Sequence, residues 1–169
     1  MEKQIQFNKK AEVNLVLFGL SFAFACDRLS KNWALSHLAF NTSTPFLPGL
    51  LNLRLVENTG AAFSLGRDNA GLMTMVASAV SVFLLLWTVN RLRKATFPAP
   101  LDRLGAGVLL GGALGNLGDR FHKGHVTDFL EFAFINFPIF NIADSLIDLG
   151  IVLICIAMLK ERQHEDAAR

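Results

Sequence analysis

Residues 71–90, GLMTMVASAVSVFLLLWTVN, form a stretch of twenty positions without a charged side chain, and this stretch decides the fold class. A helix of about twenty apolar residues matches the thickness of the hydrocarbon core of a bilayer. A soluble domain hides one apolar face of a helix, but it does not hide a segment that is apolar on every face. The whole chain has the same character, with 52% hydrophobic and 18% charged residues and a mean hydropathy of +0.40. We therefore expect an integral membrane protein.

Further apolar segments predict a mainly α, polytopic membrane protein with four transmembrane helices in a single membrane-embedded domain, residues 1–169. A strand barrel is not expected, because these segments do not alternate between apolar and polar residues. The third segment is short and rich in glycine, which allows another helix to approach closely. Its glycines are Gly107, Gly111 and Gly115, at four-residue spacing, with Gly112 beside them. The predicted spans are approximately 13–33, 71–89, 104–118 and 138–159.

The distribution of basic residues predicts the orientation of the chain. Ten of the sixteen Lys and Arg residues precede the first span, lie between the second and third spans, or follow the fourth. Cytoplasmic segments are enriched in Lys and Arg, so both termini are expected in the cytoplasm. The first span also resembles a cleaved secretory signal that ends at Cys26, but Phe24 is bulky for such a site and three spans follow. We expect it to remain as an anchor.

The segment between the first two spans predicts a small β-sheet on the outer membrane face, in approximately residues 45–66. Residues 51–57, LNLRLVE, alternate between apolar and polar, which is typical of a half-buried strand. The next residues, NTGAAF, are small and allow close approach of a backbone, which makes Gly60 a candidate site residue. A second extended stretch is predicted at residues 131–137.

Two aspartates stand out in a chain built for lipid. Asp128 precedes the fourth span, and Asp144 is expected about two turns into it. Ionisable groups in membrane segments are energetically costly and usually functional. Two carboxylates that share a site hold one proton between them near neutral pH. The ionised member then takes a proton from water while the protonated member polarises a carbonyl, which is peptidase chemistry without a metal or a cofactor.

Other polar residues are expected at the same level of the membrane, on three helices and a loop. A cluster that converges from several elements indicates a site better than scattered helix-end anchors do. Asp148, one turn inward of Asp144, either faces this site or hydrogen-bonds to another helix, and we favour the second interpretation. The remaining members are Asp27, Arg28, Lys31, Asn58, Asn116, Asp119, Arg120 and Asn141.

Three other functions fit parts of the pattern. His122 and His125 lie near Asp128 and suggest zinc, but a third well-spaced ligand is missing. A small proton-coupled transporter also carries intramembrane acids, although it needs them near the bilayer midplane, whereas these acids gather at one surface. A non-catalytic scaffold would use the polar cluster as an interface. The net charge of +2 does not indicate nucleic acid, because no basic patch interleaved with aromatic residues is present.

Five sequence blocks, in this order, resemble the motif series of the bacterial lipoprotein signal peptidases, also called signal peptidase II. The resemblance covers residues 13–159. The blocks are residues 27–31 (DRLSK), 58–64 (NTGAAFS), 111–120 (GGALGNLGDR), 125–129 (HVTDF) and 140–144 (FNIAD).

The resemblance implies an aspartyl endopeptidase of the bacterial inner membrane that removes the signal peptide from diacylglyceryl-modified prolipoproteins, immediately before the lipidated cysteine. It implies that Asp128 and Asp144 are the catalytic pair, that the site faces the periplasm, and that globomycin-type cyclic peptides inhibit the enzyme. We expect a monomer that contacts its substrate and membrane lipid. Arg28 departs from the family, in which many members have an amide such as Gln. The supporting residues implied are Asp27, Lys31, Asn58, Asn116, Asp119, Arg120 and Asn141.

Overall fold

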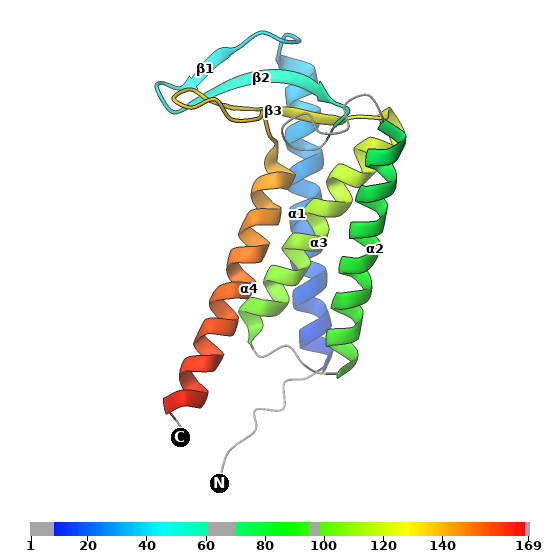
Figure 1. Ribbon diagram of the computed structural model, residues 1–169, viewed down its shortest axis with the longest axis vertical. Helices are drawn as coiled ribbons and strands as arrows, with labels where there is room; N and C mark the ends of the chain where they lie inside the picture. The colour runs from blue at the N-terminus through cyan, green and yellow to red at the C-terminus, as the bar shows by residue number, and fades with distance from the viewer. Residues whose placement is uncertain (1–8, 61–69, 95–98, 168–169) are drawn as a thin grey trace.

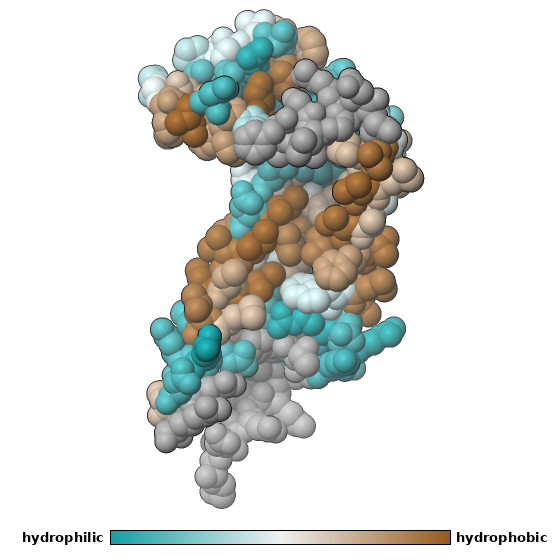
Figure 2. Space-filling model, in the orientation of Figure 1, coloured by the Kyte–Doolittle hydropathy of each residue, from teal (hydrophilic) through white to brown (hydrophobic). Residues whose placement is uncertain are grey.

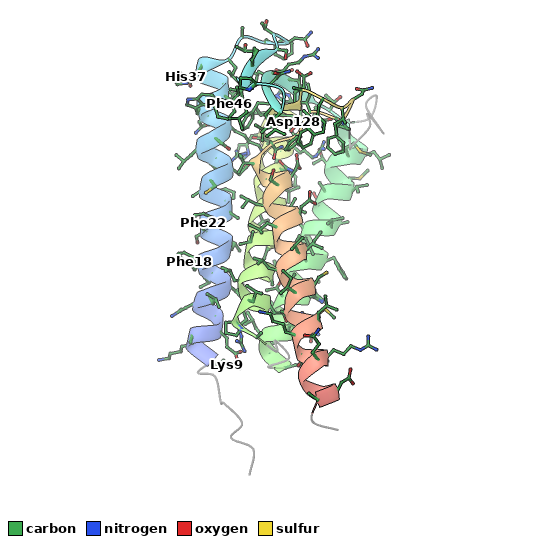
Figure 3. All side chains as sticks on the ribbon, turned by 90° about the vertical axis from the view of Figure 1, so that its left-hand side faces the viewer. Lys9, Phe18, Phe22, His37, Phe46 and Asp128 are labelled. Atoms are coloured by element: carbon green, nitrogen blue, oxygen red, sulfur yellow. The ribbon has the colours of Figure 1, made fainter. Side chains whose placement is uncertain are left out.

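The computed structural model describes residues 9–60, 70–94 and 99–167. Within these residues the helices run along the long axis of the molecule, and a three-stranded sheet lies across one end of the bundle (Figure 1). Lys9, the first residue of α1, lies at the opposite end from the sheet, whereas His37 and Asp128 lie beside it (Figure 3). The elements are α1 (Lys9–His37), β1 (Thr44–Leu47), β2 (Leu51–Asn58), α2 (Ala70–Lys94), α3 (Pro100–Lys123), β3 (Val126–Phe132) and α4 (Ile142–Ala167).

Three of the helices, α1, α2 and α4, are long and apolar enough to cross a membrane, which identifies a multi-pass membrane protein. Their exposed surfaces form an apolar band between polar ends (Figure 2). The third predicted span lies within α3, which is longer than predicted. Its glycines and the charged residues near both of its ends make α3 less apolar than the other three helices.

Helix α3 lies at the centre of the bundle, with α1 and α4 packed along it and α2 in less extensive contact. A Cβ atom added at Gly111 would collide with the Leu20 carbonyl of α1, and one added at Gly112 would lie 2.8 Å from the Ala143 carbonyl of α4. The predicted glycine stripe is therefore a packing surface. It brings the helices that carry the polar residues together.

The sheet is antiparallel, in the order β1-β2-β3. Strands β1 and β2 correspond to the predicted segment at 45–66, of which residues 61–66 lie outside the described residues. The extended stretch predicted at 131–137 is correct only in its first two residues, because β3 occupies Val126–Phe132. Its pairing with β2 runs from Asn58 opposite Val126 to Leu51 opposite Phe132. Asp128 is thus held within a strand.

Helix α4 begins at Ile142, later than the predicted start at 138, because Asn141 caps it. The side-chain Oδ1 of Asn141 accepts a hydrogen bond from the backbone N–H of Asp144 (3.0 Å), and Asp144 Oδ2 accepts one from the backbone N–H of Asn141 (3.0 Å). This reciprocal arrangement is a capping box. Asp144 therefore lies in the first turn of α4, not two turns into it.

The end of the bundle opposite the sheet also contains buried charges. Arg103 Nη2 lies 2.8 Å from Glu12 Oε1, and Arg91 Nη2 lies 2.5 Å from Asp102 Oδ2. Each acid pairs with an arginine, and these ion pairs join α1 to α3 and α2 to α3.

Candidate functional site

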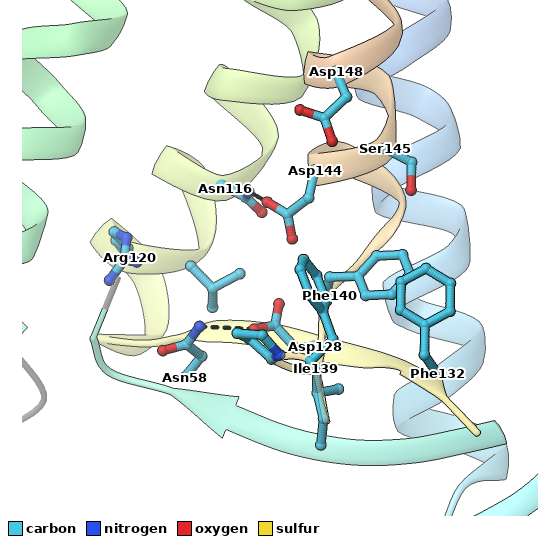
Figure 4. Close-up of a pocket in the computed structure, with 13 residues that line it drawn as sticks. Asn58, Asn116, Arg120, Asp128, Phe132, Ile139, Phe140, Asp144, Ser145 and Asp148 are labelled. Carbon is cyan, nitrogen blue, oxygen red and sulfur yellow. Dashed lines mark hydrogen bonds between the residues drawn. The ribbon is translucent and has the colours of Figure 1, made fainter. Parts of the chain in front are cut away.

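A cavity of about 570 Å³ opens where the sheet meets the helices. Aromatic and aliphatic side chains of β3 and of the segment that leads into α4 form one part of its lining (Figure 4). The other part is polar and combines residues from β2, α3, β3 and α4. These polar residues are Asn58, Asn116, Arg120, Asp128, Asp144, Ser145 and Asp148.

Asp128 reaches this cavity from β3 and is only 2% exposed. Its Oδ2 accepts a hydrogen bond from Asn58 Nδ2 of the neighbouring strand (2.8 Å), and its Oδ1 accepts one from Asn141 Nδ2 (2.6 Å). Strand β3 is itself attached to the start of α4, since Leu130 and Phe140 exchange backbone hydrogen bonds. Backbone pairing therefore brings Asp128 close to the first turn of α4.

Asn141 contacts both carboxylates. Its side chain donates to Asp128, and its backbone N–H donates to Asp144 as part of the helix cap. The second oxygen of Asp144 accepts a hydrogen bond from Asn116 Nδ2 of α3 (2.8 Å). Asn141, the N-cap of α4, thus fixes the positions of Asp128 and Asp144 relative to each other.

The two carboxylates are surrounded by carboxamides. Asn58, Asn116 and Asn141 donate the side-chain hydrogen bonds to Asp128 and Asp144. Burial and the nearby charge of Asp144 raise the pKa of Asp128 to about 7, because the amide hydrogen bonds only partly stabilise its charged form. Asp128 therefore holds its proton up to neutral pH.

A second pair of buried aspartates lies beside the first and is surrounded by cations. Lys31 Nζ lies 2.8 Å from Asp27 Oδ1 and 3.1 Å from Asp119 Oδ2, and all three side chains are within 1% of full burial. Arg28 bridges the same two carboxylates, and Lys123 contacts Asp119. Lys31 also donates to Asn116 Oδ1 (2.8 Å), which connects the two pairs.

Arg120 and Gly60 connect the cavity to the end of β2. Arg120 Nη2 donates to the Gly60 carbonyl (2.6 Å), and the Gly60 N–H donates to Asn58 Oδ1 (3.0 Å). Arg120 does not pair with the nearby carboxylates of Asp27 and Asp119, which are contacted by Arg28, Lys31 and Lys123 instead. Arg120 Nη1 is buried without a hydrogen-bond partner among the described residues.

The ten residues predicted for the site belong to one continuous polar network. Each member contacts at least one other through a hydrogen bond or an ion pair. The members are Asp27, Lys31, Asn58, Gly60, Asn116, Asp119, Arg120, Asp128, Asn141 and Asp144.

Two features of the site were not predicted from the sequence: the orientation of Asp148 and the contact of Asn141 with both acids. Asp148 lines the cavity, so the expectation that it faces another helix was wrong. The bridging role of Asn141 was missed, although the spacing of Asn141 and Asp144 in FNIAD, three residues apart at a helix start, is the signature of a capping box.

The two histidines lie apart from the cavity: His122 contacts the Gly118 carbonyl of its own helix and His125 lies 3.7 Å from Glu57. Among the described residues no group of three potential metal ligands gathers.

Comparison with known proteins gives a consistent result. The profile of the signal peptidase II family matches residues 20–160. The lipoprotein signal peptidase of Nostoc punctiforme is 40% identical over 142 residues, which cover 82% of this chain and 85% of that protein. The lipoprotein signal peptidase of Streptococcus pyogenes serotype M6 is 32% identical over 152 residues, which cover 90% and 97% of the two chains.

The fold also matches a solved structure. A bacterial membrane enzyme determined by the in meso method at 2.3 Å resolution superposes with a TM-score of 0.73 and 27% sequence identity, covering 97% of this chain and 95% of that chain. The alternative function, a small proton-coupled transporter, finds no support in these matches.

Proposed function

This chain belongs to the signal peptidase II family and is a membrane peptidase, and we propose that Asp128 and Asp144 are the groups with which it cleaves lipoprotein precursors. The observation that carries the proposal is the contact of Asn141 with both carboxylates. Asn141 fixes the two acids relative to each other. The surrounding amides are neutral, so they allow the pair to keep one shared proton. This arrangement supplies an acid and a base in one cavity.

The reaction needs one proton on the pair. The ionised carboxylate takes a proton from a water molecule, and the water oxygen attacks the scissile carbonyl carbon. The protonated carboxyl donates a hydrogen bond to the carbonyl oxygen and stabilises the negative charge that develops there. The C–N bond then breaks, the amine leaves with a proton returned by the pair, and the new carboxyl end of the signal peptide is released.

The surroundings of the cavity suit a substrate that arrives from lipid. Helices α2 and α4 both pack on α3, and below the sheet Figure 2 shows an apolar recess between them. A diacylglyceryl group favours hydrocarbon by about 0.8 kcal/mol per buried CH₂. We propose that the acyl chains of the modified cysteine remain in the bilayer while the peptide enters sideways. The cleavage site would lie immediately before that cysteine.

The proposed orientation follows from the basic residues. Helices α1 and α4 would each have their sheet-distal end in the cytoplasm, next to the Lys and Arg residues that favour that side. Helix α3 would be the fourth span, shielded from lipid by its neighbours. The sheet and the cavity would then face the periplasm, and the protein would act as a monomer in the bacterial inner membrane.

Cleavage of a diacylated prolipoprotein by the purified protein, read by mass, tests the proposal. Asp128→Asn and Asp144→Asn should each lower kcat/KM by about a thousandfold or more, because each removes one half of the acid–base pair. Asp166→Asn, at the exposed far end of α4, is the matched control and should retain activity. A globomycin-type peptide should inhibit the wild type. Full activity in a folded Asp128→Asn or Asp144→Asn variant would contradict the assignment.

A further inference from the structure

Asp148 differs from the other carboxylates near the cavity. It lies one turn beyond Asp144 on the same face of α4, further from the sheet, and its side chain is exposed in the cavity (Figure 4). Among the described residues, no hydrogen bond or ion pair engages it. Asp27, Asp119, Asp128 and Asp144 each have at least two partners.

This position is energetically unfavourable for an acid without a partner. The neighbouring residues of α4 are mostly apolar, and an acid in a membrane helix costs several kcal/mol unless it finds a donor or lies in a wet cavity. Because the carboxyl faces the cavity, the peptide that fills the cavity would be its natural partner.

The distance from Asp144 indicates which part of a bound peptide Asp148 would meet. Four residues of helix rise about 6 Å, which corresponds to about two residues of extended chain or four of helical chain. Asp148 lies toward the middle of the bundle, the direction from which the signal peptide would reach the acid pair. It would therefore contact a residue two to four positions before the scissile bond.

We propose that Asp148 is a specificity residue, which selects signal peptides with a hydroxyl side chain, Ser or Thr, two to four positions before the scissile bond. This inference rests on the proposed function. A hydroxyl is small enough for a cavity walled by Phe132, Phe137 and Phe140, and it offers a donor to either form of the carboxyl. An apolar side chain at that position would leave Asp148 without a partner and deprived of water.

A panel of four diacylated prolipoproteins tests this proposal. The parent has Ala at the second, third and fourth positions before the scissile bond, and each of the others has a single Ser at one of these positions. For the wild type, one Ser substrate should have a kcat/KM about three- to tenfold above the parent, the factor expected for one hydrogen bond. Asp148→Leu should reduce that ratio to about one, whereas Asp148→Asn, which still accepts a hydrogen bond, should retain most of it.

The controls separate this role from others. Asp166→Asn should keep the wild-type Ser-to-Ala ratio. Equal rates for all four substrates in the wild type, or an unchanged ratio in Asp148→Leu, would overturn the proposal. An equal slowing of all substrates by Asp148→Leu would also overturn it and would indicate contact with the peptide backbone. A shifted pH profile with an unchanged Ser-to-Ala ratio in Asp148→Leu would overturn it in favour of an electrostatic effect on the acid pair. If the wild type cleaves none of the substrates, the proposed function itself fails.

Discussion

Two pairs of buried aspartates lie side by side in this protein, and they differ in what surrounds them. Asp27 and Asp119 are contacted by the cations of Arg28 and Lys31. Asp128 and Asp144 receive their side-chain hydrogen bonds from carboxamides. A cation favours the charged form of a carboxyl strongly, whereas a neutral amide satisfies its lone pairs with a weaker effect on its charge. The first pair is therefore suited to hold α1 and α3 together, and the second to share a proton.

Asn116 separates the two environments. Its Oδ1 accepts a hydrogen bond from Lys31 Nζ (2.8 Å), while its Nδ2 donates to Asp144 Oδ1 (2.8 Å). The ammonium group thus fixes the orientation of the amide without touching Asp144 directly. Lys31 therefore fixes the position of Asn116, and Asn116 in turn fixes that of Asp144. The positive charge of Lys31 stays one residue away from the acid pair.

A cation placed next to Asp128 should abolish this difference. Asn58 is half-buried at the edge of the cavity, so the side chain of Asn58→Lys has room to reach Asp128. The ion pair would lower the pKa of Asp128 and remove the shared proton at neutral pH. We expect kcat/KM at pH 7 to fall by about a hundredfold or more, the usual contribution of a general acid.

Asn58→Met is the matched control, because it is similar in length and carries no charge. It removes the hydrogen bond that lowers the pKa of Asp128, so its activity should extend to higher pH than that of the wild type. Its activity at pH 7 should fall by about tenfold at most. Equal losses in both variants, with the same pH profile, would show that the charge is not what matters.

A change in the ion-pair cluster should affect stability instead of chemistry. Asp119→Asn leaves Lys31 with one carboxylate fewer in a site where its side chain is 1% exposed. Breaking a buried pair in this way costs about 3 kcal/mol or more in free energy of unfolding. Thermal unfolding in detergent measures the loss, and Lys31→Met in the same chain should recover part of it. An unchanged Tm in Asp119→Asn would contradict the bracing role.

The pH dependence of cleavage reports on the shared proton. The pKa of Asp128 is raised to about 7, so the protonated form predominates below that value and is lost above it. Activity should therefore fall as the pH rises through about 7, approaching tenfold per pH unit, if the proton on this group is required. The measurement is kcat/KM on a diacylated prolipoprotein between about pH 6 and pH 9. A rate that stays constant or increases over this range would show that Asp128 does not carry the acid.

The sequence predicted most of the helices, and it singled out polar residues that the structure brings together, for identifiable reasons. Long apolar segments such as 71–90 have few structures open to them in a bilayer, so the helices followed from composition. Polar residues such as Asp128 and Asn116 are rare in such a chain, and their rarity identified them.

Boundaries and contacts were harder to predict, because they depend on residues that are distant in the sequence. The position of β3 is set by its register with β2, and the sequence around Asp128 carries no strong alternation of its own. The start of α4 depends on two hydrogen bonds between Asn141 and Asp144, which outweigh the apolar character of the preceding residues. The orientation of Asp148 depends on how α4 packs against α3 beside the cavity, which no local pattern encodes.

The substitution Arg28→Gln would test whether the ion-pair cluster needs Arg28 in addition to Lys31. Its side chain is 30% exposed, and both of its carboxylate partners are also contacted by the buried Lys31. Ion pairs open to solvent contribute about 1 kcal/mol or less, so Arg28→Gln should lower the free energy of unfolding by no more than that. Cleavage should stay within about twofold of the wild type, because Lys31 still orients Asn116. A loss as large as that of Asp119→Asn would mean that Lys31 cannot neutralise the two carboxylates alone, and that the cluster is stabilised by its total charge and not by a single buried lysine.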